Sequence, residues 1–474
     1  MSKLNLEDLT ITKAAAAMAQ GEFTASQLTA AYLERIGERN ENLNAYLEVF
    51  TDQAEEEAAE IDQKRERGEE LPLLAGIPVA VKDNILIEGR SVSAGSKILA
   101  GYKASYDAAA IAKLRQAGAV FLGRTNMDEF AMGSSTENSA FGPTKNSHDE
   151  SRVPGGSSGG SAVAIAADLA LVSLGSDTGG SIRQPASFCG VVGLKPTYGL
   201  VSRSGLIAMA SSLDQIGPFA KTVEDAELVF DAIKGRDDKD ATSLPDDFHG
   251  AQTTKKELTI GVPRSFLEKN LASNTLENFQ KATDKLQQAG HKIQDIDLPN
   301  ISYALFCYYV LMPAEASANL ARFDGVRYGL HEDGDDLLGD YLKTRGSGFG
   351  REVKRRIVLG TYMLSAGYYD AYYGQAQKVA RLIQDDLAQA LKTVDAIATP
   401  TSPTTAFKIG EKVGDPLQMY LADIFTVPAN IAGLPAISIP SGKDGANLPL
   451  GLQLMSASGQ ESVLFALGKD YERY

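Results

Sequence analysis

Residues 155–181 read GGSSGGSAVAIAADLALVSLGSDTGGS, and this stretch decides which fold the sequence predicts. A glycine- and serine-rich turn, 155–161, runs directly into an apolar helix that we expect over 159–168. A strand expected over 170–175 then leads into a second turn of the same composition, 175–181. Flexible linkers share this composition, but they are not embedded between a helix and a strand. Both turns therefore present their backbone amides from a rigid scaffold.

Short apolar strands and helices alternate on both sides of these turns. Residues 76–81 form an apolar strand and 119–122 the next one, and between them Asp107 is the expected N-cap of a helix that ends at Gly118. This alternation predicts an α/β core. Further expected strands cover 191–194, 258–262, 436–439 and 451–454, and further helices cover 275–290 and most of the tyrosine-rich segment 303–388.

The first seventy residues are expected to form a helical segment that packs on this core. Thr24-Ala25-Ser26-Gln27 has the spacing of a capping box. The charged run 52–70 is typical of a solvated helix face. The apolar side chains that follow the capping box fall on one helical face, namely Leu28, Tyr32, Leu33 and Ile36.

The composition is that of a globular protein. Its 474 residues could hold about three average domains of roughly 150 residues each, or one large α/β domain. Apolar residues make up 43% and charged residues 23%, so the chain can bury a large core. The polar, turn-rich stretch 235–256 is either a domain linker or a surface loop, and we favour a surface loop within one domain.

Charge and cysteine usage exclude several classes of function. The net charge of −15 repels phosphate backbones, and no basic patch offsets it, so this chain is not expected to hold nucleic acid by itself. Cys189 and Cys307 are far apart and form no C-x-x-C motif, which argues against a disulfide framework or a zinc site and fits a reducing cytoplasm. The most apolar window, 162–174, is too short for a bilayer and contains Asp168, so no membrane association is expected.

The common signatures of nucleotide and metal chemistry are absent from the sequence. It has no G-x-x-x-x-G-K-[ST] phosphate loop, no H-E-x-x-H and no EF-hand loop, so neither a metal nor a cofactor is expected in this chain. The four histidines lie in polar or helical contexts and are expected to be surface residues, not catalytic bases: His148, His249, His291 and His331.

The second turn can support nucleophilic catalysis. Two glycines before Ser181 permit backbone angles at which successive N–H groups, from Thr178 to Ser181, converge on one point. Such a nest can stabilise an oxyanion, and losing one donor typically costs roughly 3 kcal/mol of transition-state stabilisation. Ser181 is then a candidate nucleophile, although an alcohol needs a base to become one.

Lys82 is the candidate base. It ends the apolar strand 77–81, and a lysine in a poorly solvated site loses its charge readily. The alternative is that Lys82 pairs with Asp83 or another carboxylate at the strand end. A neutral Lys82 could deprotonate Ser181 through an intervening hydroxyl, for which Ser157 in the first turn is suitably placed.

A competing motif overlaps the first turn. Residues 155–159 match G-x-S-x-G, the nucleophile elbow of α/β-hydrolases. An elbow requires a strand immediately before it, whereas residues 146–154 read as a polar loop. We therefore interpret the match as accidental.

Three motifs in chain order resemble the amidase signature family: GIPVAVKD over 76–83, PGGSSGGS over 154–161 and GSDTGGSIR over 175–183. The resemblance implies one large amidase domain over 1–474, with a mixed central β-sheet flanked by many α-helices. It also implies a triad of a lysine, a bridging serine preceded by a cis peptide, and a serine nucleophile. By motif position these are Lys82, Ser157 and Ser181. The implied oxyanion-hole amides are those of Thr178, Gly179, Gly180 and Ser181.

Three further stretches are similar to one branch of that family, the A subunits of aspartyl/glutamyl-tRNA amidotransferases. They are ARFDGVRYG over 321–329, GFGREVKRRI over 348–357 and GYYDAYY over 367–373. The similarity covers nearly the whole chain, although the end at 472–474 is somewhat short for the family. It implies that the chain hydrolyses glutamine and delivers the ammonia to a partner subunit.

The resemblance also implies the ligands of glutamine. The substrate α-carboxylate needs a cation and its α-ammonium needs an anion, for which Arg356 and Asp423 fit by position. Arg355 is the alternative cation, and Asp423 could instead pair with a neighbouring cation. Asp177 and Arg183 flank the nucleophile turn and are expected to brace it.

The partners follow from the same branch of the family. A B subunit would use ATP and Mg²⁺ to activate mischarged tRNA, converting Glu-tRNA(Gln), Asp-tRNA(Asn) or both, and a small C subunit would join the two chains. The assignment of ATP and tRNA to another subunit agrees with the absence of a phosphate loop from this sequence and with its net charge of −15. The main alternative is a stand-alone amidase that acts on another small amide, and a second is a subunit that only scaffolds a complex.

Overall fold

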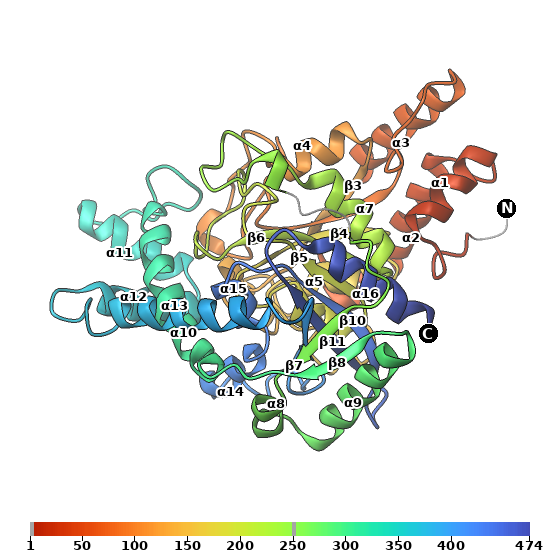
Figure 1. The fold of residues 1–474 in the computed structure, drawn as a ribbon. Coiled ribbons are helices and arrows are strands. Elements are labelled where there is room, and N and C mark those ends of the chain that lie inside the picture. Colours follow the sequence, from red (N-terminus) through yellow and green to blue (C-terminus); the bar gives the residue numbers. More distant parts are fainter. Residues whose placement is uncertain (1–3, 249–252) are drawn as a thin grey trace.

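A mixed β-sheet of eleven strands crosses the part of the chain that the computed structural model describes, residues 4–248 and 253–474 (Figure 1). The strand order is β1-β3-β2-β4-β6-β5-β10-β11-β9-β7-β8. Strand β2 lies parallel to β3 and β4, and β7 lies parallel to β8 and β9, whereas the pairs at the centre are antiparallel. The expected mixed α/β fold is therefore confirmed. The strands are β1 (Tyr46–Val49), β2 (Pro78–Lys82), β3 (Val120–Thr125), β4 (Val172–Asp177), β5 (Val192–Lys195), β6 (Gln215–Ala220), β7 (Thr259–Val262), β8 (Lys292–Asp295), β9 (Ala396–Pro400), β10 (Ala436–Lys443) and β11 (Pro449–Ser456).

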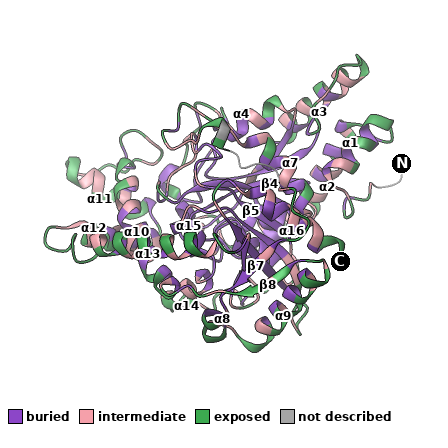
Figure 2. Cartoon of the chain, viewed as in Figure 1, coloured by how far each residue is buried: buried purple, intermediate pink, exposed green. Residues whose placement is uncertain are grey.

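Helices surround the sheet, and α10 to α13 extend away from it at one side of the molecule (Figure 1). Figure 2 shows that buried residues gather in the sheet and in the helix faces that touch it. The α-helices of the described residues are α1 (Ile11–Gln20), α2 (Ala25–Leu43), α3 (Thr51–Glu66), α4 (Ala109–Gln116), α5 (Gly159–Ala166), α6 (Arg183–Cys189), α7 (Val223–Ile233), α8 (Arg264–Asn270), α9 (Ser273–Gln288), α10 (Ala304–Asn319), α11 (Leu337–Gly348), α12 (Arg351–Leu364), α13 (Tyr373–Ala390), α14 (Pro416–Tyr420), α15 (Val427–Ile431) and α16 (Glu461–Arg473).

The central strands are covered on both faces. Every residue of β2, β4 and β6 is buried, so their polar side chains, such as Lys82, Ser176 and Asp177, lie inside the protein. One hydrophobic cluster extends from Leu6 in the N-terminal segment to Tyr471 in α16. None of the described helices is both long and apolar enough to span a lipid bilayer.

The N-terminal segment forms the predicted helices and one strand that was not predicted. At the start of α2, Thr24 Oγ1 accepts the Gln27 N–H at 3.1 Å and Gln27 Oε1 accepts the Thr24 N–H at 2.9 Å, which confirms the capping box. Leu28 and Tyr32 belong to the hydrophobic core. Strand β1 pairs with β3; four residues are too few to show a period-2 pattern in the sequence.

Two local expectations were wrong. Asp107 does not cap α4, because its carboxylate accepts the Glu88 N–H at 2.8 Å and the Arg115 Nε–H at 3.0 Å, and the helix begins after Ala108. His291 is not a surface residue: it is 5% exposed, and its Nδ1 accepts the Leu258 N–H at 3.3 Å.

The predicted surface loop 235–256 lies partly outside the described residues, as does His249. Its first half makes several turns and the short 3₁₀ helix Asp246–Phe248. Asp240 anchors these turns, because its carboxylate accepts hydrogen bonds from the Arg203 guanidinium at 2.9 Å and the Thr242 N–H at 3.0 Å.

Candidate active site

Lys82 ends β2 inside the molecule and is 0% exposed. Its Nζ lies 2.8 Å from Ser157 Oγ, 2.9 Å from Ser176 Oγ and 3.2 Å from the Ser176 carbonyl oxygen. Burial lowers the pKa of Lys82 from its ordinary value to about 7, although three nearby carboxylates oppose the shift. A substantial fraction of Lys82 is therefore neutral near pH 7 and can accept a proton.

Asp83 does not neutralise Lys82. Its carboxylate accepts a hydrogen bond from the Arg124 guanidinium at 2.7 Å and one from the Ser93 N–H at 3.1 Å. The ion pair of this strand end is thus Asp83 with Arg124, and Lys82 faces the two serines. The alternative interpretation of Lys82 as the partner of Asp83 is not supported by this geometry.

The first turn places Ser157 beside Lys82. The peptide between Gly156 and Ser157 is cis. The Ser157 carbonyl oxygen accepts the Asp128 N–H at 3.2 Å, which ties the turn to the loop after β3. A side chain at position 156 would collide with the Asp128 carboxylate, so this position requires glycine.

Hydrogen bonds join the first turn to the second. The Ser158 N–H donates to the Ser181 carbonyl oxygen at 3.2 Å, and Ser158 Oγ donates to the Ser176 carbonyl oxygen at 3.1 Å. Ser181 is 7% exposed, whereas Ser157 is fully buried. The fold thus brings the three predicted catalytic residues into one region, with Ser181 on its accessible side.

A buried ion pair braces the second turn. The Asp177 carboxylate lies 3.0 Å and 2.9 Å from two guanidinium nitrogens of Arg183, and it also accepts the N–H groups of Gly180 at 2.9 Å and Ile182 at 3.1 Å. Burial would raise the pKa of Asp177, but the Arg183 guanidinium holds that pKa well below its usual range. Asp177 therefore stays charged and fixes the backbone on both sides of Ser181.

The backbone amides of this turn differ in what they can still bind. The Gly180 N–H is already used by Asp177. In the described part of the chain, the N–H groups of Thr178, Gly179 and Ser181 have no hydrogen-bond acceptor. Gly180 has φ +133, and a side chain there would collide with Thr426, so the turn depends on glycine at this position.

The Thr178 hydroxyl anchors the turn from the other side. It donates to Asp214 Oδ1 at 2.7 Å, and Asp214 also accepts the Met209 N–H at 2.9 Å. Asn84 completes the shell around Lys82 by donating to Ser176 Oγ at 2.9 Å. Sequence reasoning missed these groups, although Ser176 lies inside the second turn and Asn84 follows Lys82 by two positions.

Arg356 reaches inward from α12. It is 3% exposed, its Nε donates to Glu352 at 2.8 Å, and its guanidinium lies 5.3 Å from the centroid of the Tyr309 ring. Arg355 pairs with the same glutamate, but 29% of its side chain is exposed. The geometry favours Arg356 as the inward-facing cation.

Asp423 lies on the other side of Tyr309. Its carboxylate accepts hydrogen bonds from the Ser134 hydroxyl at 2.7 Å and the Tyr309 hydroxyl at 3.2 Å. Burial raises the pKa of Asp423 to about 7. No ion pair holds this carboxylate among the described residues, so the alternative pairing with a neighbouring cation is not found. Tyr309 contacts both predicted glutamine ligands, and sequence reasoning missed it because nothing distinguished it among many tyrosines.

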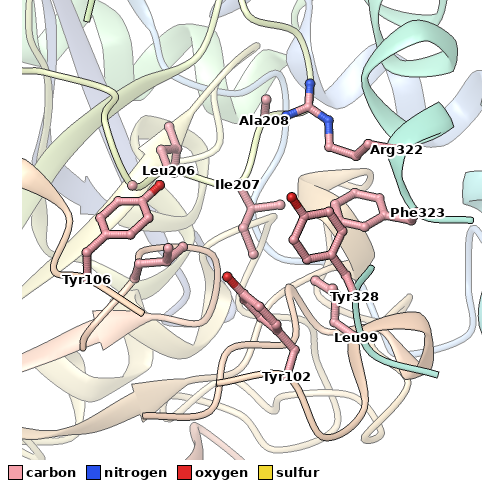
Figure 3. Close-up of a pocket in the computed structure, with 11 residues that line it drawn as sticks. Leu99, Tyr102, Tyr106, Leu206, Ile207, Ala208, Arg322, Phe323 and Tyr328 are labelled. Atoms are coloured by element: carbon pink, nitrogen blue, oxygen red, sulfur yellow. The ribbon is translucent and has the colours of Figure 1, made fainter. Parts of the chain in front are cut away.

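One cavity adjoins these groups, and a second one is lined by other residues. One, of ≈ 70 Å³, is lined by Arg355, Arg356 and Tyr420 and opens at the glutamine-ligand side. The other, of ≈ 130 Å³, is lined by the aromatic rings of Tyr102, Tyr106, Phe323 and Tyr328 with Arg322 at its edge (Figure 3). Neither cavity is lined by Lys82, Ser157 or Ser181.

Metal-binding clusters and disulfides are not found where the chain is described. No group of three or more His, Cys, Asp or Glu residues in 4–248 and 253–474 could hold a metal ion. Cys189 and Cys307 are both buried and free.

Comparison with known proteins identifies close relatives. The profile of the Amidase family matches residues 27–465. The A subunit of glutamyl-tRNA(Gln) amidotransferase from Microcystis aeruginosa is 54% identical over 456 residues, which cover 95% of this chain and 94% of the relative. The crystal structure of the corresponding A subunit from Thermotoga maritima superposes with a TM-score of 0.81 at 43% identity, covering 100% of this chain and 96% of that one. The native peptide amidase of Stenotrophomonas maltophilia is 32% identical, with a TM-score of 0.80 over 98% of this chain and 96% of that one.

Proposed function

The chain belongs to the Amidase family, and from that premise we propose that it is the glutamine-hydrolysing A subunit of a tRNA-dependent amidotransferase. The proposal is supported by the names of relatives that match over nearly their whole length. Its chemistry rests on one observation, the 2.8 Å contact between the buried amine of Lys82 and Ser157 beside the turn that carries Ser181.

The first half of the reaction is acylation. Neutral Lys82 accepts the proton of the Ser157 hydroxyl, and Ser157 in turn accepts the proton of the Ser181 hydroxyl. At the same time the Oγ of Ser181 attacks the side-chain carbonyl carbon of glutamine. The oxyanion is stabilised by the amides of the second turn, Thr178 to Ser181. Gly180 already donates to Asp177, so Thr178, Gly179 and Ser181 are the donors still available. The C–N bond breaks, the relay returns a proton to the leaving nitrogen, and ammonia departs.

The second half is deacylation. Water attacks the glutamyl ester on Ser181 while Ser157 and Lys82 accept its proton. The bond between the acyl carbon and Ser181 Oγ then breaks, the relay returns the proton to Ser181 Oγ, and glutamate leaves. The α-carboxylate of glutamine binds Arg356 and its α-ammonium binds ionised Asp423. Tyr309 contacts both of these side chains and holds them at a fixed separation.

We assign the remaining steps to partner subunits. A B subunit receives the ammonia and uses ATP and Mg²⁺ to amidate mischarged tRNA, and a C subunit joins the two chains. The net charge of −15 and the absence of a phosphate loop from the sequence support this division of labour.

The test replaces Lys82, Ser157 or Ser181 singly by alanine in the assembled complex. Glutamine-dependent transamidation should be lost, because each change removes the base, the relay or the nucleophile. Activity with ammonium salts should remain, because it bypasses this site. Normal glutamine hydrolysis by Ser181→Ala would disprove the nucleophile assignment. Vigorous hydrolysis of other small amides by the isolated chain would instead support a stand-alone amidase.

A further inference from the structure

In the described part of the chain, three oxygen atoms lie within hydrogen-bond distance of the Lys82 amine, and two of them belong to Ser176. Lys82 Nζ lies 2.9 Å from Ser176 Oγ, 3.2 Å from the Ser176 carbonyl oxygen and 2.8 Å from Ser157 Oγ. Ser176 is 2% exposed and lies in β4, which runs parallel to β2 beside it. The proposed reaction uses Ser157 as the proton relay, but it gives the Ser176 side chain no part.

The three oxygens match one protonation state of the amine. An ammonium group has three N–H donors, and the three oxygens can accept all of them. A neutral amine has two N–H donors and one lone pair, so the lone pair must then point at one of the three oxygens. Only a lone pair that points at Ser157 Oγ can take the proton of the relay. The oxygens that keep the two N–H groups therefore decide whether neutral Lys82 is a working base.

Both oxygens of Ser176 are placed to keep these two N–H groups. A carbonyl oxygen carries no proton, so it only accepts. The hydroxyl oxygen has two lone pairs, and Asn84 Nδ2 donates to one of them at 2.9 Å. The other lone pair is available to a Lys82 N–H. With both N–H groups on Ser176, the tetrahedral amine presents its lone pair to Ser157.

The backbone holds Asn84 beside Ser176. The Ile85 N–H donates to the Lys82 carbonyl oxygen at 3.0 Å and closes a turn directly after Lys82, and the Ile207 N–H donates to the Asn84 carbonyl oxygen at 2.9 Å. The Asn84 side chain is buried, and its Oδ1 has no hydrogen-bond partner in the described residues. The contact with Ser176 Oγ is thus the hydrogen bond that this buried amide makes there, and it fixes the hydroxyl next to the amine.

Nearby charges do not direct the amine. Three carboxylates face it, and all of them favour its charged form: Asp128, Asp177 and Asp214. They belong to the loop after β3, to the end of β4 and to the residue before β6. Each accepts hydrogen bonds from other groups, and none forms an ion pair with Lys82 where the chain is described. The direction of the N–H groups is therefore set by Ser157 and Ser176.

We propose that Ser176, held in place by Asn84, is a positioning residue that accepts both N–H groups of neutral Lys82 and so directs the lone pair of the amine at Ser157. The inference rests on the proposed function, because it takes the relay from Lys82 through Ser157 to Ser181 as given. When the Ser157 proton moves to Lys82 Nζ, the new N–H points at Ser157 and the other two stay on Ser176. The amine then does not have to rotate between the two halves of the reaction.

The first experiment replaces Ser176 by alanine in the full chain, co-expressed with candidate B and C subunits. An ammonium group loses more than a neutral amine when an acceptor is removed, because hydrogen bonds to charged groups are the stronger ones. The acid limb of the kcat profile should therefore move about one pH unit lower. The kcat at high pH should fall about tenfold, because the lone pair is no longer directed at Ser157. The glutamine KM should not change.

Ser173→Ala is the matched control. Ser173 lies in the same strand, is 0% exposed, and donates to the Ser161 carbonyl oxygen at 2.9 Å. Its loss should lower stability without moving the acid limb. An acid limb that stays at the wild-type pH in Ser176→Ala would overturn the proposal, whatever the kcat. So would an equal movement of the limb in Ser173→Ala, because the effect would then belong to any buried hydroxyl of β4.

Asn84→Asp should move the acid limb in the opposite direction. The substitution keeps the size of the side chain and places a carboxylate in the same buried region as Lys82, where opposite charges favour each other's ionised forms. The limb should therefore move to higher pH, whereas a purely structural role for Asn84 and Ser176 would lower activity or stability without opposite shifts. An unmoved limb or a limb at lower pH in Asn84→Asp would overturn the proposal.

A second measurement depends neither on glutamine nor on partner subunits. Diisopropyl fluorophosphate labels an activated serine: Ser181 Oγ bonds to phosphorus, fluoride leaves, and the relay takes the Ser181 proton. The labelling rate of the full chain, followed by mass spectrometry across the pH range, should show the same lower limb in Ser176→Ala. An unshifted limb, or no labelling of Ser176→Ala at any pH, would overturn the positioning role. If wild-type Ser181 is never labelled, the proposed relay itself fails, and that result is distinct from labelling with an unshifted limb.

Discussion

At the scale of single residues, the protonation of two buried groups governs the proposed reaction. Lys82 must be neutral to accept a proton, and burial lowers its pKa to about 7. Asp423 must be ionised to bind an ammonium group, and burial raises its pKa to about 7. Lys82 loses its proton and Asp423 becomes ionised as the pH rises through the same range. The first change permits the chemical step, and the second permits binding of the substrate ammonium group.

Glutaminase activity should therefore fall as the pH drops below about 7, by about tenfold per unit in kcat, because protonated Lys82 cannot act as the base. The glutamine KM should rise over the same range as Asp423 is protonated. Steady-state kinetics of the complex across pH 5.5–8.5 separates the two effects. In Asp423→Asn the pH dependence of KM should disappear while that of kcat persists; a kcat independent of pH would contradict the role of Lys82.

At the scale of elements, two consecutive carboxylates hold the pieces of the site together. Asp128 accepts the N–H groups of Thr136 at 2.8 Å and Asn138 at 3.0 Å, and so shapes the loop whose Ser134 contacts Asp423. The Glu129 carboxylate lies at the start of α12. It accepts the N–H of Gly350, which is the N-cap residue of that helix, at 2.8 Å. A carboxylate at a helix N-terminus is also favoured by the helix dipole.

Glu129→Ala should loosen α12 and so misplace Arg356. We expect a loss of about 1–3 kcal/mol in the free energy of unfolding, because the Gly350 N–H and the fully buried Ser96 hydroxyl both lose their acceptor. The glutamine KM should rise by about tenfold, equivalent to about 1.4 kcal/mol, with ammonium-dependent activity unchanged. Urea unfolding and steady-state kinetics measure both. Glu129→Gln keeps an acceptor and should change the KM much less; an equal change in both variants would contradict the explanation.

At the scale of the whole molecule, one core ties the two ends of the chain together. Helix α16 packs on α7 and β11, and the hydrophobic cluster that it joins also contains Leu6. Removing the end of the chain therefore exposes the same core on which the catalytic strands rest. The main buried apolar side chains of α16 are Val463, Leu464, Phe465, Leu467 and Tyr471.

Deletion of residues 461–474 should abolish cooperative folding. Each of the five buried side chains contributes roughly 2 kcal/mol, and the total is comparable with the whole stability of a typical domain, about 5–15 kcal/mol. Thermal unfolding followed by circular dichroism would test this. A truncated chain with an unchanged Tm would show that α16 is an independent appendage. Tyr474→Ser serves as the control, because this side chain is 67% exposed, and it should leave the Tm unchanged.

The sequence determined the local features that depend on residue type and spacing. The capping box at Thr24, the apolar strand before Lys82 and the two glycine-rich turns could all be predicted. The cap and the turns depend on residues a few positions apart, and the strand is a run of apolar residues between turn signals. Motif positions also predicted Lys82, Ser157 and Ser181, whose roles remain predictions. Strands β1, β6, β8 and β9 were missed, because short strands carry little periodic signal of their own and depend on pairing partners.

Only the tertiary structure decided which groups meet. It showed that Asp83 forms an ion pair with Arg124, whereas Lys82 lies within hydrogen-bond distance of Ser157. It also showed that Tyr309 lies between Arg356 and Asp423. These contacts join residues that are up to 114 positions apart along the chain. Their geometry depends on the order of the strands and the packing of α12 on α10, which no local pattern encodes.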